Sequence, residues 1–155
     1  MESWVLTCET IARHDFRLTC EASGERRWTI ETYDVFECLM RLRLQVERAG
    51  WLLCCNGARR DSWSTGMARD MGGGWLVYLL EGVPKAQRPP LVPTLDPVAP
   101  ELAATVEQQW LWNGKRFAQT HPDAPISGEK LYSYSDWLQR IAGARLDGDL
   151  PPRVP

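Results

Sequence analysis

Residues 34–50, DVFECLMRLRLQVERAG, decide the fold. Apolar side chains recur along this stretch at intervals of three or four residues, namely Val35, Phe36, Leu39, Met40, Leu42, Val46 and Ala49. This spacing is that of a helix with one wide apolar face. Asp34 is a favourable N-cap, and Gly50 is a natural residue just beyond a helix end. The sequence therefore predicts one main helix over 34–49.

Three segments before this helix have the period-two alternation of half-buried strands. The clearest is 15–22, where Phe16, Leu18, Cys20 and Ala22 alternate with charged residues and threonine. Residues 4–9 and 28–30 show the same alternation, and residues 23–25 supply a turn. The spacing predicts an antiparallel meander with one face in water.

Two short apolar runs follow the helix, at 51–55 and 75–80, and each predicts a strand buried on both faces. We therefore expect an α+β fold, with an antiparallel β-β-β-α-β-β sheet and the main helix packed on it. One or two further helices are expected near the C-terminus, at 101–119 and 135–144. The whole of 1–155 is interpreted as a single domain, with an extended Pro-rich segment at 84–100 and a disordered tail at 147–155.

Charge and composition narrow the class of protein. The formal net charge is −2 and the isoelectric point about 5.7, so a general nucleic-acid partner is not expected. The first residues show no charged and then apolar signal pattern, and the longest apolar run is too short for a membrane span. We expect a cytoplasmic protein with no membrane partner. The five cysteines include no CxxC pair, so neither a disulfide framework nor a metal site is predicted.

The segment 56–74 between the two apolar runs gathers three arginines, two aspartates, three hydroxyls and five glycines. A connection of this length is commonly functional. The candidate binding residues are Arg59, Arg60, Asp61, Trp63, Arg69 and Asp70. Arginines and glycine backbone N–H groups suit an anion or a polar partner. Equally, the glycines can serve a turn while the arginines pair with the aspartates.

Catalytic residues are not predicted anywhere in the chain. The segment 56–74 contains neither GxxxxGK[ST] nor GxGxxG, and no GxSxG is present. The two histidines, His14 and His121, have no carboxylate at the spacing of metal ligands. We therefore expect no enzyme activity, no metal and no cofactor.

The residues NGARRD at 56–61 and STGMARDMGGG at 64–74 carry a resemblance. Together with residues 42–47, 95–97 and 105–109, they are similar in order and spacing to a group of small uncharacterised bacterial proteins. The resemblance spans roughly residues 28–112 and implies no particular activity. In size and texture, such proteins resemble the immunity proteins of bacterial toxin systems.

Our leading hypothesis is a protein-binding inhibitor, an immunity protein that neutralises a cognate toxin domain. The alternative is a small-molecule or nucleotide/phosphate-binding module using the segment 56–74, including a hydrolase or transferase that acts on a phosphate compound. A homo-oligomeric structural protein is a third interpretation, because the chain has eight tryptophans, a residue type enriched at interfaces.

Overall fold

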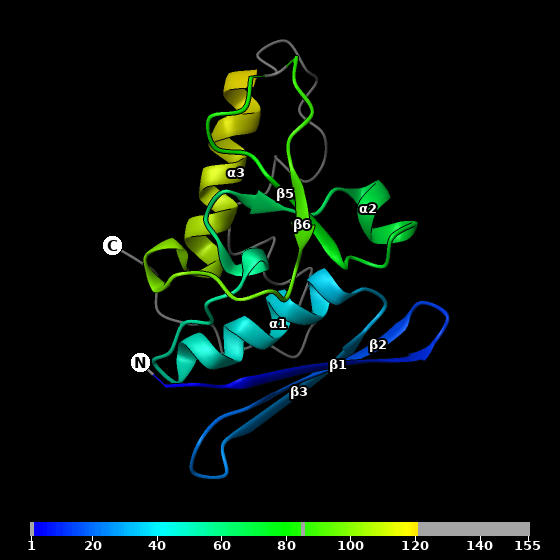
Figure 1. Ribbon diagram of the computed structural model, residues 1–155, viewed down its shortest axis with the longest axis vertical. Helices are drawn as coiled ribbons and strands as arrows, with labels where there is room; N and C mark the ends of the chain where they lie inside the picture. The colour runs from blue at the N-terminus through cyan, green and yellow to red at the C-terminus, as the bar shows by residue number, and fades with distance from the viewer. Residues whose placement is uncertain (1, 85, 121–155) are drawn as a thin grey trace.

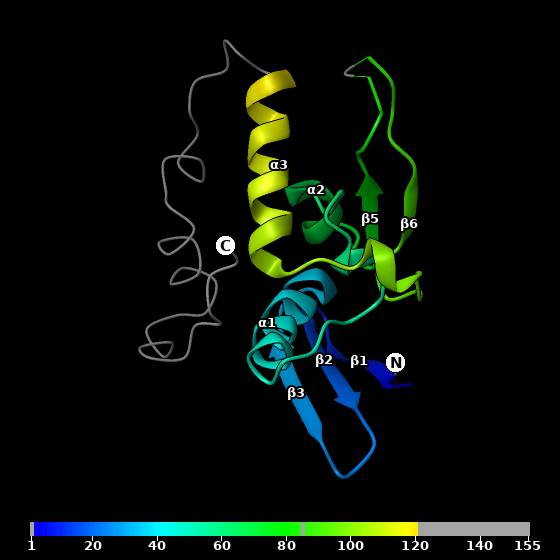
Figure 2. The same cartoon turned by 90° about the vertical axis from the view of Figure 1, so that its left-hand side faces the viewer.

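The computed structural model describes residues 2–84 and 86–120, and it shows two three-stranded antiparallel sheets with a helix between them (Figures 1 and 2). The predicted α+β class is confirmed. The elements are, in chain order, β1 (Val5–Ala12), β2 (Asp15–Glu21), β3 (Arg27–Thr32), α1 (Val35–Arg48), the 3-10 helix η1 (Asn56–Ala58), β4 (Ser62–Trp63), α2 (Gly66–Asp70), β5 (Leu76–Leu79), β6 (Leu91–Pro93), the 3-10 helix η2 (Pro100–Leu102) and α3 (Val106–Thr120).

The first sheet is the predicted meander, in the order β1-β2-β3. Leu18 pairs with Cys8 on one side and with Ile30 on the other, so these three side chains form a row across the sheet. Cys20 pairs with Leu6 on one side and with Trp28 on the other, and these three side chains form the next row. The two rows lie two residues apart along the strands, so they are on the same face of the sheet. That face packs on α1.

α1 begins after Asp34, whose carboxylate accepts a hydrogen bond from the backbone N–H of Glu37 at 2.7 Å. It ends before Gly50, which has a φ of +89°. Both boundaries therefore confirm the sequence prediction. The helix is buried on more than its apolar stripe: one side packs on the first sheet, while Phe36, Met40 and Leu44 enter a second core with Val77 and Val106.

The second sheet has the order β4-β5-β6 and lies on the other side of α1 (Figure 2). The prediction of one continuous sheet is therefore wrong. The strand predicted at 51–55 is also wrong, because only Cys55 makes a β-bridge there, to Pro97. The run is apolar because Leu53 and Cys55 enter the first core as irregular chain. The strand predicted at 75–80 is confirmed as β5, but its predicted burial on both faces is wrong, because Leu76 is 43% exposed.

The Pro-rich segment packs onto the fold rather than running free. Although prolines were expected to exclude regular structure from it, Leu91–Pro93 forms β6 at the edge of the second sheet, where a proline is tolerated. Beyond it, the carbonyls of Thr94 and Asp96 accept hydrogen bonds from the N–H groups of Gly57 and Asn56, at 2.8 and 2.9 Å. These contacts tie the segment to η1.

Arg43 connects α1 to the rest of the second half, although only 1% of the residue is exposed. Its guanidinium donates to the carbonyls of Gly57 and Ala104, at 3.2 and 2.8 Å, and to Oε1 of Gln109 on α3. Gln109 is itself fully buried and donates to Gly57 O and to both oxygens of Ser62. Glu47 lies 3.8 Å from Nε of Arg43 and accepts from the N–H of Val106. The network therefore joins α1, η1, β4 and α3.

The helix predicted at 101–119 is confirmed in part, since Pro100–Leu102 is a 3-10 turn and α3 begins at Val106. The helix predicted at 135–144, the tail at 147–155 and His121 lie outside the described residues. Within the described ranges, no helix has both the length and the apolar character needed to cross a bilayer.

Replacing Arg43 with methionine should destabilise the protein by about 3 kcal/mol, because Oε1 of Gln109 and the carbonyl of Ala104 would lose their donor and the buried Glu47 would lose its opposite charge. The matched control is Arg27→Met, since the Arg27 side chain is 63% exposed and its ion pair is long, at 3.5 Å. That change should stay within about 0.5 kcal/mol of the wild type. Urea denaturation followed by circular dichroism measures both, and equal losses in the two variants would contradict the role given to Arg43.

Candidate functional site

The segment 56–74, interpreted from sequence as a long connection, contains three short elements: η1, β4 and α2. α2 begins after Thr65, whose hydroxyl accepts a hydrogen bond from the N–H of Ala68 at 3.2 Å. A helix of five residues has little stability of its own, so contacts with the rest of the protein must hold it in place.

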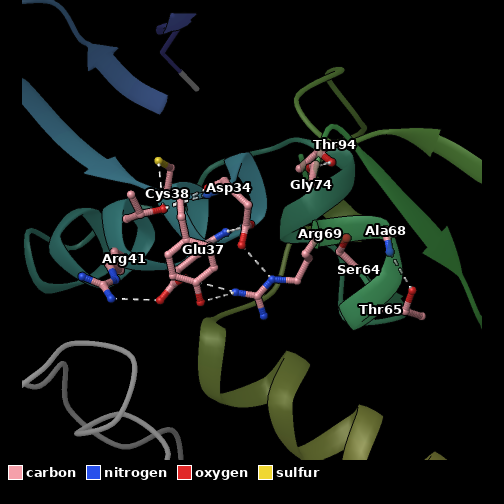
Figure 3. A network of polar contacts seen from close by, with 12 residues as sticks. Asp34, Glu37, Cys38, Arg41, Ser64, Thr65, Ala68, Arg69, Gly74 and Thr94 are labelled. Carbon is pink, nitrogen blue, oxygen red and sulfur yellow. Dashed lines mark hydrogen bonds and ion pairs between the residues drawn. The ribbon is translucent and has the colours of Figure 1, made fainter. Parts of the chain in front are cut away.

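Arg69 holds α2 against the start of α1 (Figure 3). Its Nε donates to Oδ2 of Asp34 at 2.9 Å, and its Nη2 donates to Oε2 of Glu37 at 3.2 Å. Nη2 also lies 3.3 Å from the hydroxyl of Tyr33. The second carboxylate oxygen of Glu37 accepts from Arg41, at 2.9 Å. The two acidic side chains at the first turn of α1 therefore face two guanidinium groups.

Burial controls the electrostatics of this cluster. Desolvation raises the pKa of Asp34, against the opposing effect of Arg69 and of the N–H of Glu37. Desolvation, together with a hydrogen bond to Glu37, also raises the pKa of Tyr33 to about 12, so its hydroxyl stays protonated at neutral pH. Asp34 is fully buried, and both of its oxygens are already engaged by N–H donors. The cluster is therefore arranged as a structural clamp.

The glycine run completes this clamp. Gly73 and Gly74 have φ values of +65° and +71°, which favour glycine. Through this turn the carbonyl of Gly73 accepts from the N–H of Val35, at 2.8 Å, and the carbonyl of Gly74 accepts from the hydroxyl of Thr94, at 2.8 Å. A Cβ on Gly74 would lie 2.7 Å from the backbone nitrogen of Phe36. Only glycine lets the chain pass this close to α1.

The structure separates the six residues predicted as binding residues. Arg59 forms a two-bonded pair with the buried Asp61, at 2.8 and 3.0 Å. Trp63 packs edge-on against Phe36, with 5.4 Å between ring centroids, and borders the second core. With Arg69 in the clamp, four of the six are buried or half-buried and have partners within the fold.

The remaining two predicted residues, Arg60 and Asp70, are on the surface. Arg60 pairs with Glu81 at 3.0 Å, with both side chains more than half exposed, and lies over the ring of Trp112. Asp70 is exposed on α2 and makes no ion pair or side-chain hydrogen bond among the described residues. The predicted residues therefore do not converge on one site, and Asp70 alone offers an unpaired charge.

Among the residues that the structure describes, the most exposed large apolar side chains belong to two residues that the sequence interpretation passed over. Met67 is 73% exposed and Met71 is 84% exposed. They lie one helical turn apart, whereas Arg69 lies about 200° around the helix from Met67. We call Met67, Asp70 and Met71 the α2 face. The signal available from sequence was the i, i+4 spacing of two methionines between glycines.

A large apolar side chain in water forgoes the free energy that burial against a partner would provide. The helix that carries them is fixed on its opposite side by Arg69 and by the glycine turn. The α2 face therefore presents two apolar side chains and one carboxylate on a backbone that is held in place from the opposite side. Among the described residues, no group of three or more His, Cys, Asp or Glu side chains could hold a metal ion.

No family model matches the chain, and no curated protein matches its sequence. The resemblance to small bacterial proteins through the segment 56–74 accordingly stays a prediction.

Replacing Gly74 with alanine should destabilise the protein by more than about 3 kcal/mol, because backbone strain at positive φ adds to a clash with α1. Gly82→Ala is the matched control. Gly82 has a similar φ of +73°, but an added Cβ would meet nothing within 4 Å. The control should lose only about 1–2 kcal/mol. Thermal and urea denaturation compare the two variants. Equal losses in the free energy of unfolding would show that the clash with α1 makes no contribution.

Replacing Arg69 with methionine should cost about 3 kcal/mol, because it leaves Asp34 and Glu37 buried beside each other without the guanidinium that pairs with both. Arg60→Met serves as the control, since an exposed ion pair contributes at most about 1 kcal/mol. Hydrogen exchange at the amides of α2 adds a local readout. Slow exchange retained in Arg69→Met would contradict the clamp.

Proposed function

We propose that this chain is a protein-binding inhibitor, an immunity protein that neutralises a cognate toxin, and that the α2 face is the centre of its contact surface. The observation that carries the proposal is the exposure of Met67 and Met71 on a helix anchored from behind. Methionine side chains adapt their shape to an apolar partner surface.

The clamp makes the α2 face suitable for tight binding. A surface that is already ordered loses less conformational entropy when a partner binds. Arg69 and the glycine turn fix the backbone of α2, while the two methionine side chains keep their own rotamer freedom. Asp70 supplies a charge that would pair with a lysine or arginine of the partner at the rim of the contact.

This assignment revises the contact residues predicted from sequence. Arg59, Asp61, Trp63 and Arg69 support the fold by internal contacts, so they are not offered to a partner. The anion-binding alternative loses its main support for the same reason, because Arg59, Arg60 and Arg69 each contact a carboxylate. The likeness to immunity proteins in size and texture favours an inhibitor over a general binding module.

The test compares two double variants of equal charge change as baits in a lysate of the host. Met67→Glu with Met71→Glu places two carboxylates on the α2 face. Leu52→Glu with Leu102→Glu is the control, since these leucines are 45% and 43% exposed elsewhere on the surface. Circular dichroism first confirms that both variants fold.

Wild type and the control should capture the same partner, and the α2-face variant should bind it about tenfold or more weakly, through lost apolar burial and added charge. The purified partner should arrest growth when expressed alone and be neutralised by one equivalent of wild type. Equal capture by both variants would remove the α2 face from the interface. A captured partner with no toxic activity would overturn the inhibitor assignment.

A further inference from the structure

We infer that Met67 and Met71 form a paired oxidation site, through which a hydroperoxide such as hydrogen peroxide switches the α2 face from apolar to polar. The effect on a partner rests on the proposed function. The selectivity of the oxidation and the change in the surface do not, and they are measured on the protein alone.

Selectivity follows from exposure. Met67 and Met71 are 73% and 84% exposed, whereas Met40 is 2% exposed and belongs to the second core. In the reaction, the thioether sulfur takes one oxygen atom from the peroxide, giving a sulfoxide and water. Because the sulfur must meet the peroxide directly, Met40 is protected by the side chains around it, and the fold survives oxidation of the other two.

The thiols near the first sheet compete poorly for the oxidant. Peroxide reacts with the thiolate form of cysteine. Desolvation by burial raises the pKa of Cys8 and of Cys20 to about 11, so both remain protonated at neutral pH. A thioether has no proton to lose, and its reaction has no such requirement. Oxygen transfer to Met67 and Met71 therefore meets little competition from Cys8 and Cys20.

The clamp determines what oxidation changes. A sulfoxide is polar and chiral, and methionine sulfoxide reductases return it to methionine with two electrons from a dithiol, which becomes a disulfide as the oxygen leaves as water. Arg69 holds the opposite side of α2 through Asp34 and Glu37, and neither methionine sulfur takes part in those contacts. Oxidation accordingly leaves α2 in place and alters the character of its outer face. The change is reversible and confined to the contact surface.

The first experiment maps the oxidation with hydrogen peroxide on the full chain. Trypsin separates Met40, Met67 and Met71, because it releases residues 28–41 with Met40, residues 61–69 with Met67 and residues 70–85 with Met71. The peptides with Met67 and Met71 should each gain one oxygen atom while that with Met40 stays unchanged. Oxidation of Met40 at the same rate as the other two would overturn the proposal.

The second experiment measures the surface on a phenyl resin. Oxidised wild type should elute earlier than untreated wild type, and treatment with the reductases should restore its retention. Met67→Leu with Met71→Leu keeps an apolar face without sulfur, so its retention should be the same before and after peroxide. Unchanged retention of oxidised wild type would show that the two sulfoxides do not alter the face.

The third experiment uses the partner captured by wild type. Oxidised wild type should bind it about tenfold more weakly, and the Met67→Leu, Met71→Leu variant should bind it normally before and after peroxide. If the glutamate variant loses the partner while oxidised wild type keeps it, the switch is wrong and the interface stands. If the glutamate variant also keeps the partner, the proposed contact surface is wrong, whatever the first two experiments give.

Discussion

The guanidinium of Arg43 carries a full charge into a position where almost none of its surface meets water. A charge in such a place is tolerated only when every donor finds an acceptor. The acceptors come from η1, from the chain before α3 and from α3 itself, so these segments have to be where Arg43 needs them. The same requirement applies at the other end of α1, where Asp34 and Glu37 need Arg69. The second half of the fold thus depends on polar contacts at both ends of α1, whereas the first sheet packs on α1 through apolar side chains.

Local periodicity was sufficient to predict the first half of the chain. The meander and α1 obey the simple periods of two and of three to four residues, and Asp34 and Gly50 mark the helix ends as expected. The run at 51–55 misled for a physical reason. Leu53 and Cys55 fill the core between α1 and the first sheet, and an apolar composition does not distinguish a strand from an irregular segment that enters the core in this way.

The candidate site was predicted less well, because the role of each residue depends on partners that lie far away in the sequence. Arg59 and Asp61 are close in sequence, and their pairing was one of the two interpretations left open. Arg69, in contrast, pairs with residues more than thirty positions earlier, and no local pattern indicates such a contact. The predicted binding residues were mainly charged, so Met67 and Met71 were not among them. Their spacing was visible, but their exposure depends on which side of α2 Arg69 anchors.

The partners of Arg43 lie far along the chain from it, and this has a consequence for synthesis and folding. The meander and α1 are complete once residue 50 has been made, and their contacts are short in sequence, which favours rapid formation. Gln109 and the carbonyl of Ala104 arrive only some sixty residues later. On the ribosome, the meander and α1 would therefore form before the partners of Arg43 have been synthesised. Water can solvate Arg43 in that interval, so the charge keeps the unfinished half hydrated until α3 emerges and replaces the water.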